Sequence, residues 1–105
     1  MNTSALTRAD VKARLAKAQD EIFRLGVRRL ALFGSVERDG AQPNSDVDLL
    51  VEFEPGQKTF DHFLELGELL ERVLDRSVDL VTAESLSPFL GPHILAGATD
   101  VLRAA

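Results

Sequence analysis

Two aspartates at alternate positions of a predicted strand, Asp46 and Asp48, constrain the fold more than any other feature of this sequence. Between and after them every second residue is apolar: Val47, Leu49, Val51 and Phe53. Side chains two residues apart in a strand lie on one face of a sheet, about 7 Å apart at their Cα atoms. Aspartate is a poor strand former, so we expect both carboxylates to serve the folded protein on that face.

Length and composition predict a compact folded chain. The 105 residues are 45% hydrophobic and 28% charged, a balance typical of globular proteins, and we expect a single domain over residues 1–105. No run of about 18 apolar residues is present to span a bilayer, so we expect a cytoplasmic protein with no membrane partner. The absence of cysteine excludes disulfides and thiolate metal sites, and any metal must be held by oxygen or histidine.

The net charge of −5 argues against a nucleic-acid-binding protein. Binding a phosphate backbone without sequence preference requires an excess of Lys and Arg, which this chain lacks. Arg24, Arg28 and Arg29 form a local basic group, which we interpret as a solvated surface. No direct nucleic-acid binding is therefore expected.

Hydrophobic spacing predicts the first half of the fold. Thr7 and Asp10 are typical of a helix start, and apolar residues at 11, 15, 18, 22 and 25 predict one amphipathic helix that ends at Gly26. A strand is predicted over 27–33, followed by a brief helix within 34–40 and a turn-rich stretch over 39–45. The strand that carries the two aspartates is predicted over 46–53.

The second half of the chain repeats this alternation. Thr59 is expected to cap a helix with apolar residues between 60 and 74, and a third strand is predicted over 77–82. From Ser85 onward we expect one or two helices, interrupted at Gly91-Pro92. The order of elements indicates an α+β fold, a small mixed β-sheet flanked by helices.

A third acid, Asp79, stands alone in the otherwise apolar third strand. If it faces the same point as Asp46 and Asp48, three carboxylates could hold two divalent cations about 4 Å apart, the arrangement used for in-line phosphoryl displacement. Mg²⁺ prefers oxygen ligands and keeps coordination sites for water and phosphate. These residues therefore predict a metal-dependent site that handles nucleotides.

Gly34 and Ser35 lie where the first strand gives way to a turn or short helix. Free backbone N–H groups and a small hydroxyl at such a place can receive phosphate oxygens, and glycine lets a ligand approach the backbone closely. The spacing is Gly34-Ser35, ten intervening residues, then Asp46-x-Asp48.

These runs resemble a known family. Leu32-Phe33-Gly34-Ser35, Arg38 and Ser45-Asp46-Val47-Asp48-Leu49-Leu50-Val51 resemble the minimal nucleotidyltransferases (MNT type) of the polymerase-beta-like superfamily. The run Val78-Asp79-Leu80-Val81 resembles the strand that bears the family's third metal-binding acid. The chain is similar to the MntA antitoxins that accompany HepT-like toxins, which carry a HEPN domain.

The resemblance implies a reaction and a role for each matching residue. AMP would pass from ATP to a tyrosine hydroxyl of the toxin in the presence of Mg²⁺, with two ions expected. Gly34 and Ser35 would bind the triphosphate, with Arg38 and Ser45 near the phosphates. Asp46 and Asp48 would ligate both ions, and Asp79 would ligate the catalytic ion and help to deprotonate the acceptor hydroxyl.

Other interpretations remain open at this point. The aspartates could lie on a solvated strand face, Gly34 could be a turn glycine and Ser35 a helix cap. The protein could neutralise its partner by binding alone, or transfer a nucleotide to a small hydroxylated molecule such as an aminoglycoside. We interpret Phe60, Phe63 and Leu64 as core residues rather than a purine pocket, although the exposed part of the helical stripe could bind a partner.

Overall fold

The computed structural model describes residues 6–37 and 45–104. Along the chain the elements are α1 (Arg8–Lys17), α2 (Gln19–Arg24), β1 (Val27–Phe33), α3 (Gly34–Glu37), β2 (Val47–Phe53), α4 (Phe60–Leu74), β3 (Val78–Thr82), the 3₁₀ turn η1 (Ala83–Ser85), α5 (Gly91–Gly97) and β4 (Thr99–Arg103). Across these residues, no helix has the length and apolar character needed to cross a membrane.

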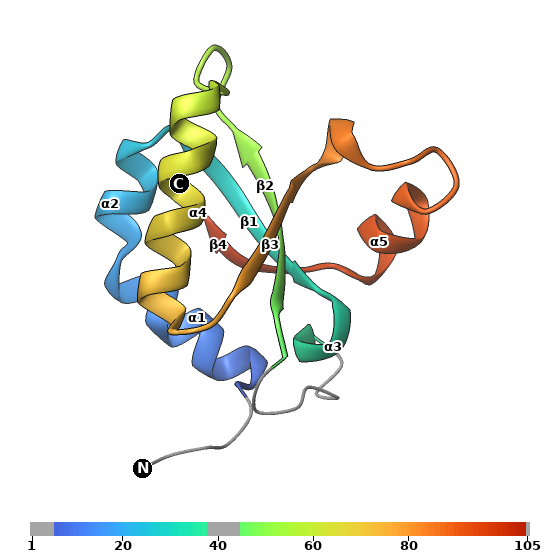
Figure 1. Cartoon of the computed structure of the whole chain (residues 1–105), viewed down its shortest axis with the longest axis horizontal. Coiled ribbons are helices and arrows are strands. Elements are labelled where there is room, and N and C mark those ends of the chain that lie inside the picture. The colour runs from blue at the N-terminus through green and yellow to red at the C-terminus, as the bar shows by residue number, and fades with distance from the viewer. Residues whose placement is uncertain (1–5, 38–44, 105) are drawn as a thin grey trace.

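The four strands form one mixed sheet in the order β3-β2-β1-β4. Strand β1 is antiparallel to β2 and β4, whereas β2 and β3 are parallel and are connected through α4. Helices α1, α2 and α4 lie on one side of the sheet, and the segment with η1 and α5 extends on the other side (Figure 1). The predicted α+β fold with a small mixed sheet is confirmed.

The hydrophobic core lies between the sheet and the three helices α1, α2 and α4. One face of β2 contributes side chains that are at most 1% exposed, and α4 meets them with a stripe of leucines: Val47, Leu49, Val51, Leu66, Leu70 and Leu74. Burying one such side chain stabilises the fold by about 1.5–3 kcal/mol. Because the helices cover this face, Asp48 must lie on the opposite face of β2.

Three predicted helix boundaries are confirmed. Thr7 caps α1 in a reciprocal pair with Asp10, and Oγ1 of Thr59 accepts a hydrogen bond from the backbone N–H of His62 at 3.1 Å. Gly26 adopts a left-handed conformation, with φ of 84°, between α2 and β1. These residues start and stop the helices independently of the distant parts of the chain.

The prediction of one continuous N-terminal helix is wrong. The helix breaks at Ala18, whose φ of −108° and ψ of 12° end α1, and α2 starts at the next residue. Val11, Leu15 and Ile22 still reach the core, because the apolar spacing of three and four residues continues across the break. The hydrophobic pattern therefore gives no sign of it.

The prediction for the C-terminal stretch is also wrong in part. Val101 and Leu102, which were assigned to a helix, lie in β4, where Leu102 pairs with Leu30 of β1. This strand covers an edge of β1 that would otherwise be unpaired. Gly91-Pro92 does not interrupt a helix but begins α5, where proline lacks only an N–H that has no partner in the first turn.

Candidate active site

The acids of β2 and β3 lie next to each other on the face of the sheet opposite helices α1, α2 and α4, which we call the open face. Asp48 and Asp79 are direct partners in the parallel pairing of the two strands, so their side chains leave the sheet on the same side. Asp46 lies one residue before β2, two positions from Asp48 in the sequence, and is exposed. The register of β2 and β3 therefore places Asp48 and Asp79, which the sequence predicts on two separate strands, side by side.

Gly34 lies directly against the carboxylate of Asp48. Its φ is 78°, and a Cβ placed on it would overlap Oδ2 of Asp48. The residue is where β1 ends and α3 begins, and Phe33 just before it pairs with Asp48 across the antiparallel strands. A side chain at position 34 would thus displace the carboxylate as well as strain the backbone.

The structure describes less of the other three predicted site residues, Ser35, Arg38 and Ser45. The backbone of Ser35 lies in the first turn of α3, and Ser45 is half-buried immediately before Asp46. Arg38 lies outside the described residues. The roles of Ser35 and Ser45 as nucleotide-binding residues stay predictions.

Carboxylate oxygen is the donor that Mg²⁺ prefers, and Asp48 and Asp79 supply it from neighbouring strands. Within residues 6–37 and 45–104, no three acidic or histidine side chains gather closely enough to hold one ion together. The donor chemistry fits a divalent cation, whereas joint ligation by Asp46, Asp48 and Asp79 stays a prediction.

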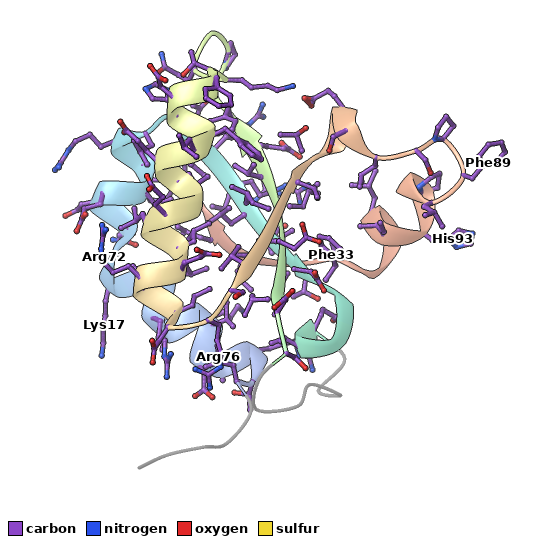
Figure 2. The ribbon with its side chains drawn as sticks, in the orientation of Figure 1. Lys17, Phe33, Arg72, Arg76, Phe89 and His93 are labelled. Carbon is purple, nitrogen blue, oxygen red and sulfur yellow. The ribbon has the colours of Figure 1, made fainter. Side chains whose placement is uncertain are left out.

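A cavity of about 250 Å³ opens beside Gly34. Phe33, Gly34 and Glu37 line it from the sheet side, and residues of α5 close it from the other: His93, Ile94 and Gly97. In the segment between η1 and α5, Phe89 projects away from the sheet (Figure 2). The cavity thus adjoins the glycine that contacts Asp48, and its walls offer both apolar and hydrogen-bonding groups.

Glu37 fixes the short helix α3 to the rest of the molecule. Its carboxylate accepts a hydrogen bond from Oγ1 of Thr99 in β4 at 2.9 Å and from Nη1 of Arg8 in α1 at 3.4 Å. Both partners are far from Glu37 in the sequence, so local patterns give no signal for this contact. It holds the helix that begins at Gly34 against two other elements.

An ion-pair network crosses the open face beyond the acids. The side chain of Arg29 is only 17% exposed, and its guanidinium pairs with Glu52 at 2.7 Å and with Asp100 at 2.5 Å. The hydrogen bond to Asp100 raises the pKa of Arg29. Burial alone would raise the pKa of Asp100, but hydrogen bonds from Arg29 and Arg103 outweigh it and lower that pKa.

The network corrects the interpretation of the basic group as a solvated surface. Arg24 and Arg28 are exposed, but Arg29 is neutralised by acids of the neighbouring strands β2 and β4. The pairing of the strands, with a register shift between Val27 and Arg29, determines which acids Arg29 meets.

Comparison with known proteins shows which family this chain resembles. A family model described as a nucleotidyltransferase domain matches residues 12–98. The protein adenylyltransferase MntA of Thermococcus cleftensis is 38% identical over 91 residues, which cover 86% of this chain and 91% of that protein.

Solved structures share the fold. A structure solved as that of a minimal nucleotidyltransferase has a TM-score of 0.75 and 35% identity, and the match covers 89% of this chain and 94% of that chain. A complex of a tri-AMPylated Shewanella oneidensis HEPN toxin with an MNT antitoxin has a TM-score of 0.64 at 20% identity, covering 93% of this chain and 74% of that chain. At that identity the second likeness shows the fold alone.

Proposed function

This chain belongs to the nucleotidyltransferase domain family and is a nucleotidyltransferase, and from that membership we propose that it transfers AMP from ATP to a hydroxyl of a partner protein. The observation that supports this most is the arrangement of Asp48, which partners Asp79 on the open face of the sheet and lies against Gly34 at the start of α3. Carboxylates that lie beside backbone to which a phosphate can come close are suited to phosphoryl chemistry on a bound nucleotide.

In the proposed reaction the acceptor oxygen attacks the α-phosphorus of ATP. A bond forms between that oxygen and phosphorus, the bond from phosphorus to the bridging oxygen breaks, and pyrophosphate leaves. The proton of the hydroxyl passes to the carboxylate of Asp79. Mg²⁺, when bound by Asp46, Asp48 and Asp79, supplies charge neutralisation for the phosphates and for the leaving group.

The nucleotide is proposed to lie along the start of α3. Backbone N–H groups at Gly34 and Ser35 are suited to the triphosphate, because the first N–H groups of a helix have no partner within it. Arg38 and Ser45 are proposed to contact phosphates from the flanking segments. The cavity beside Gly34 could accept the base against the apolar side chains of Phe33 and Ile94.

The proposed acceptor is a tyrosine of a cognate HEPN-domain toxin of the HepT type. In support, a relative at 38% identity is named a protein adenylyltransferase, and the fold recurs in an antitoxin bound to an AMPylated HEPN toxin. A bulky, negatively charged AMP group on the toxin would inactivate it, which makes this chain an antitoxin that acts by modification.

The test is transfer of label to the purified partner. The protein is incubated with ATP labelled at the α-phosphate and Mg²⁺, with and without a HEPN-domain partner, and in parallel with ATP labelled at the γ-phosphate. The proposal is supported if the partner is labelled by ATP carrying the label at the α-phosphate and not by ATP carrying it at the γ-phosphate. A tight complex without label would favour neutralisation by binding, and label on an aminoglycoside instead would favour a small-molecule acceptor.

A further inference from the structure

A groove runs between α4 and the outer edge of β3, next to the proposed site. It has a volume of about 350 Å³ and is lined by Phe63, Leu64, Gly67, Glu68 and Glu71 of α4 and by Val78–Leu80 of β3. Strand β3 is at the edge of the sheet. Asp79, the partner of Asp48 in the neighbouring strand, is therefore one of the residues along the groove.

Gly67 in the middle of α4 has no structural explanation among the described residues. A Cβ placed on it meets no atom within 4 Å beyond its own helical turn. Glycine in a helix interior is destabilising by roughly 0.5–1 kcal/mol relative to alanine, and no close packing against the described residues offsets that cost. Its effect is to leave helix backbone open at the floor of the groove, where another chain can approach closely.

Among the described residues, the outer edge of β3 has one backbone N–H without a hydrogen-bond partner. The N–H of Val47 donates to the carbonyl of Ser77, so Ser77, Asp79 and Val81 turn their backbone groups toward β2. Val78, Leu80 and Thr82 turn theirs outward. The outward N–H of Val78 is bonded to Glu71 at 3.0 Å, and that of Thr82 to Ser85 at 3.3 Å.

Leu80 lies between these two protected donors. In the described part of the chain no hydrogen bond engages its outward N–H or carbonyl. An unpaired donor and acceptor on an edge strand are the groups to which an added strand binds. Because the N–H groups of Val78 and Thr82 are already bonded, the N–H of Leu80 is the donor on this edge of β3 that such a strand can use.

The chemistry of the groove defines what it can bind. Its acidic residues are Glu68, Glu71 and Asp79, and no Lys or Arg is among its described lining residues. At one end α4 also exposes large apolar side chains, Phe60 at 77% and Leu64 at 51%, although both were predicted as core. Only Phe63 of that predicted group packs against the core. The groove thus fits a segment that carries basic and apolar side chains.

We propose that an extended segment of the acceptor protein, with basic and apolar side chains, docks in this groove by pairing with Leu80 and lying over Gly67. The inference rests on the proposed function, because it assigns the place of the protein acceptor in the same reaction. A residue paired with Leu80 would turn its side chain toward Gly67, and the residues before and after it would turn theirs toward the face that carries Asp79. The hydroxyl to be modified can reach the acids from such a position.

Gly67→Leu and Gly67→Ala test this docking with the full-length protein and its HEPN-domain partner. We expect Gly67→Leu to raise the dissociation constant for the partner, measured by calorimetry, at least 10-fold. The KM for the partner should rise by the same factor. The dissociation constant for ATP should stay within about twofold. Gly67→Ala should raise the melting temperature while weakening partner binding, a combination that loss of folding cannot produce.

Glu65→Leu is the matched control, because Glu65 is exposed on the same helix but lines the hollow beside α2 instead. It should leave partner binding unchanged. Equal partner binding by Gly67→Leu and wild type would overturn the inference while leaving the proposed function intact. A wild type that binds the partner through the groove without transferring AMP would overturn only the proposed function, and a wild type that does neither would overturn both.

Discussion

The carboxylate of Asp48 occupies the space in which a Cβ of residue 34 would stand. Gly34 is therefore required for two reasons, its left-handed φ of 78° and its contact with Asp48. Gly34 is the first residue of α3, directly after β1, and Asp48 is the second residue of β2. The start of α3 and the acid are thereby held at one point of the open face.

We predict that Gly34→Ala lowers AMP transfer by about 100-fold or more, because even a small displacement of a reacting group costs this much. The methyl group would displace Asp48, and the left-handed backbone would cost about 1–2 kcal/mol of folding stability. Initial rates of transfer and thermal denaturation measure the two effects separately.

Gly56→Ala is the control for this substitution. Gly56 has nearly the same φ, 80°, but a Cβ there meets nothing within 4 Å. It should lose similar stability and keep its transfer activity. If both variants lost activity equally, backbone strain rather than the contact with Asp48 would explain the loss.

Asp79→Asn should impair the chemical step more than nucleotide binding. We expect kcat to fall about 100-fold or more, the range of general-base effects, while the dissociation constant for ATP changes little. Single-turnover rates and equilibrium binding of ATP provide the comparison. Equal losses in both would assign Asp79 to nucleotide binding.

Thr99→Val should loosen the attachment of α3, because it removes the hydrogen bond from Oγ1 to Glu37 while keeping the shape of the side chain. We expect a loss of about 1 kcal/mol in the free energy of unfolding and a higher KM for ATP. Denaturant titration and steady-state kinetics measure these effects. A variant that is destabilised without any change in KM would show that α3 keeps its place without this bond.

Asp100→Asn should change how stability depends on pH. The pKa of Asp100 is lowered below its ordinary value of 3.8, so the stabilisation is present above that value and is lost as the pH falls through the lower pKa of the folded state. Because the side chain is 40% exposed, we expect at most about 1 kcal/mol. Urea titrations of wild type and variant should differ at pH 7 and converge only as the pH falls below the lowered pKa of the folded state, and a constant difference would contradict this.

Much of the fold follows from local patterns in the sequence. Strand β1 begins and ends as predicted, and Thr7, Gly26 and Thr59 mark helix ends because each acts on the backbone next to it. The sequence does not indicate the break at Ala18, because the apolar spacing continues across it. The sequence does not indicate strand β4 either, because Val101 and Leu102 form too short an apolar run to distinguish a strand from a helix.

The candidate site was predictable as residue types and spacings but not as contacts. Alternation placed Asp46 and Asp48 on one face, whereas the pairing of Asp48 with Asp79 depends on the register of two strands joined by a long connection. The contact of Gly34 with Asp48 and the bond of Glu37 to Thr99 depend equally on tertiary structure. Long-range contacts of this kind leave no local signal.

The central claim is that the acids of this face carry out nucleotidyl transfer to the partner. The most direct test is the intact mass of a purified HEPN-domain partner after incubation with ATP, Mg²⁺ and either wild type or the variant Asp46→Asn/Asp48→Asn. We predict that wild type adds one or more AMP units and that the variant, folded as judged by circular dichroism, adds none. A folded variant that modifies the partner as fast as wild type would contradict the account.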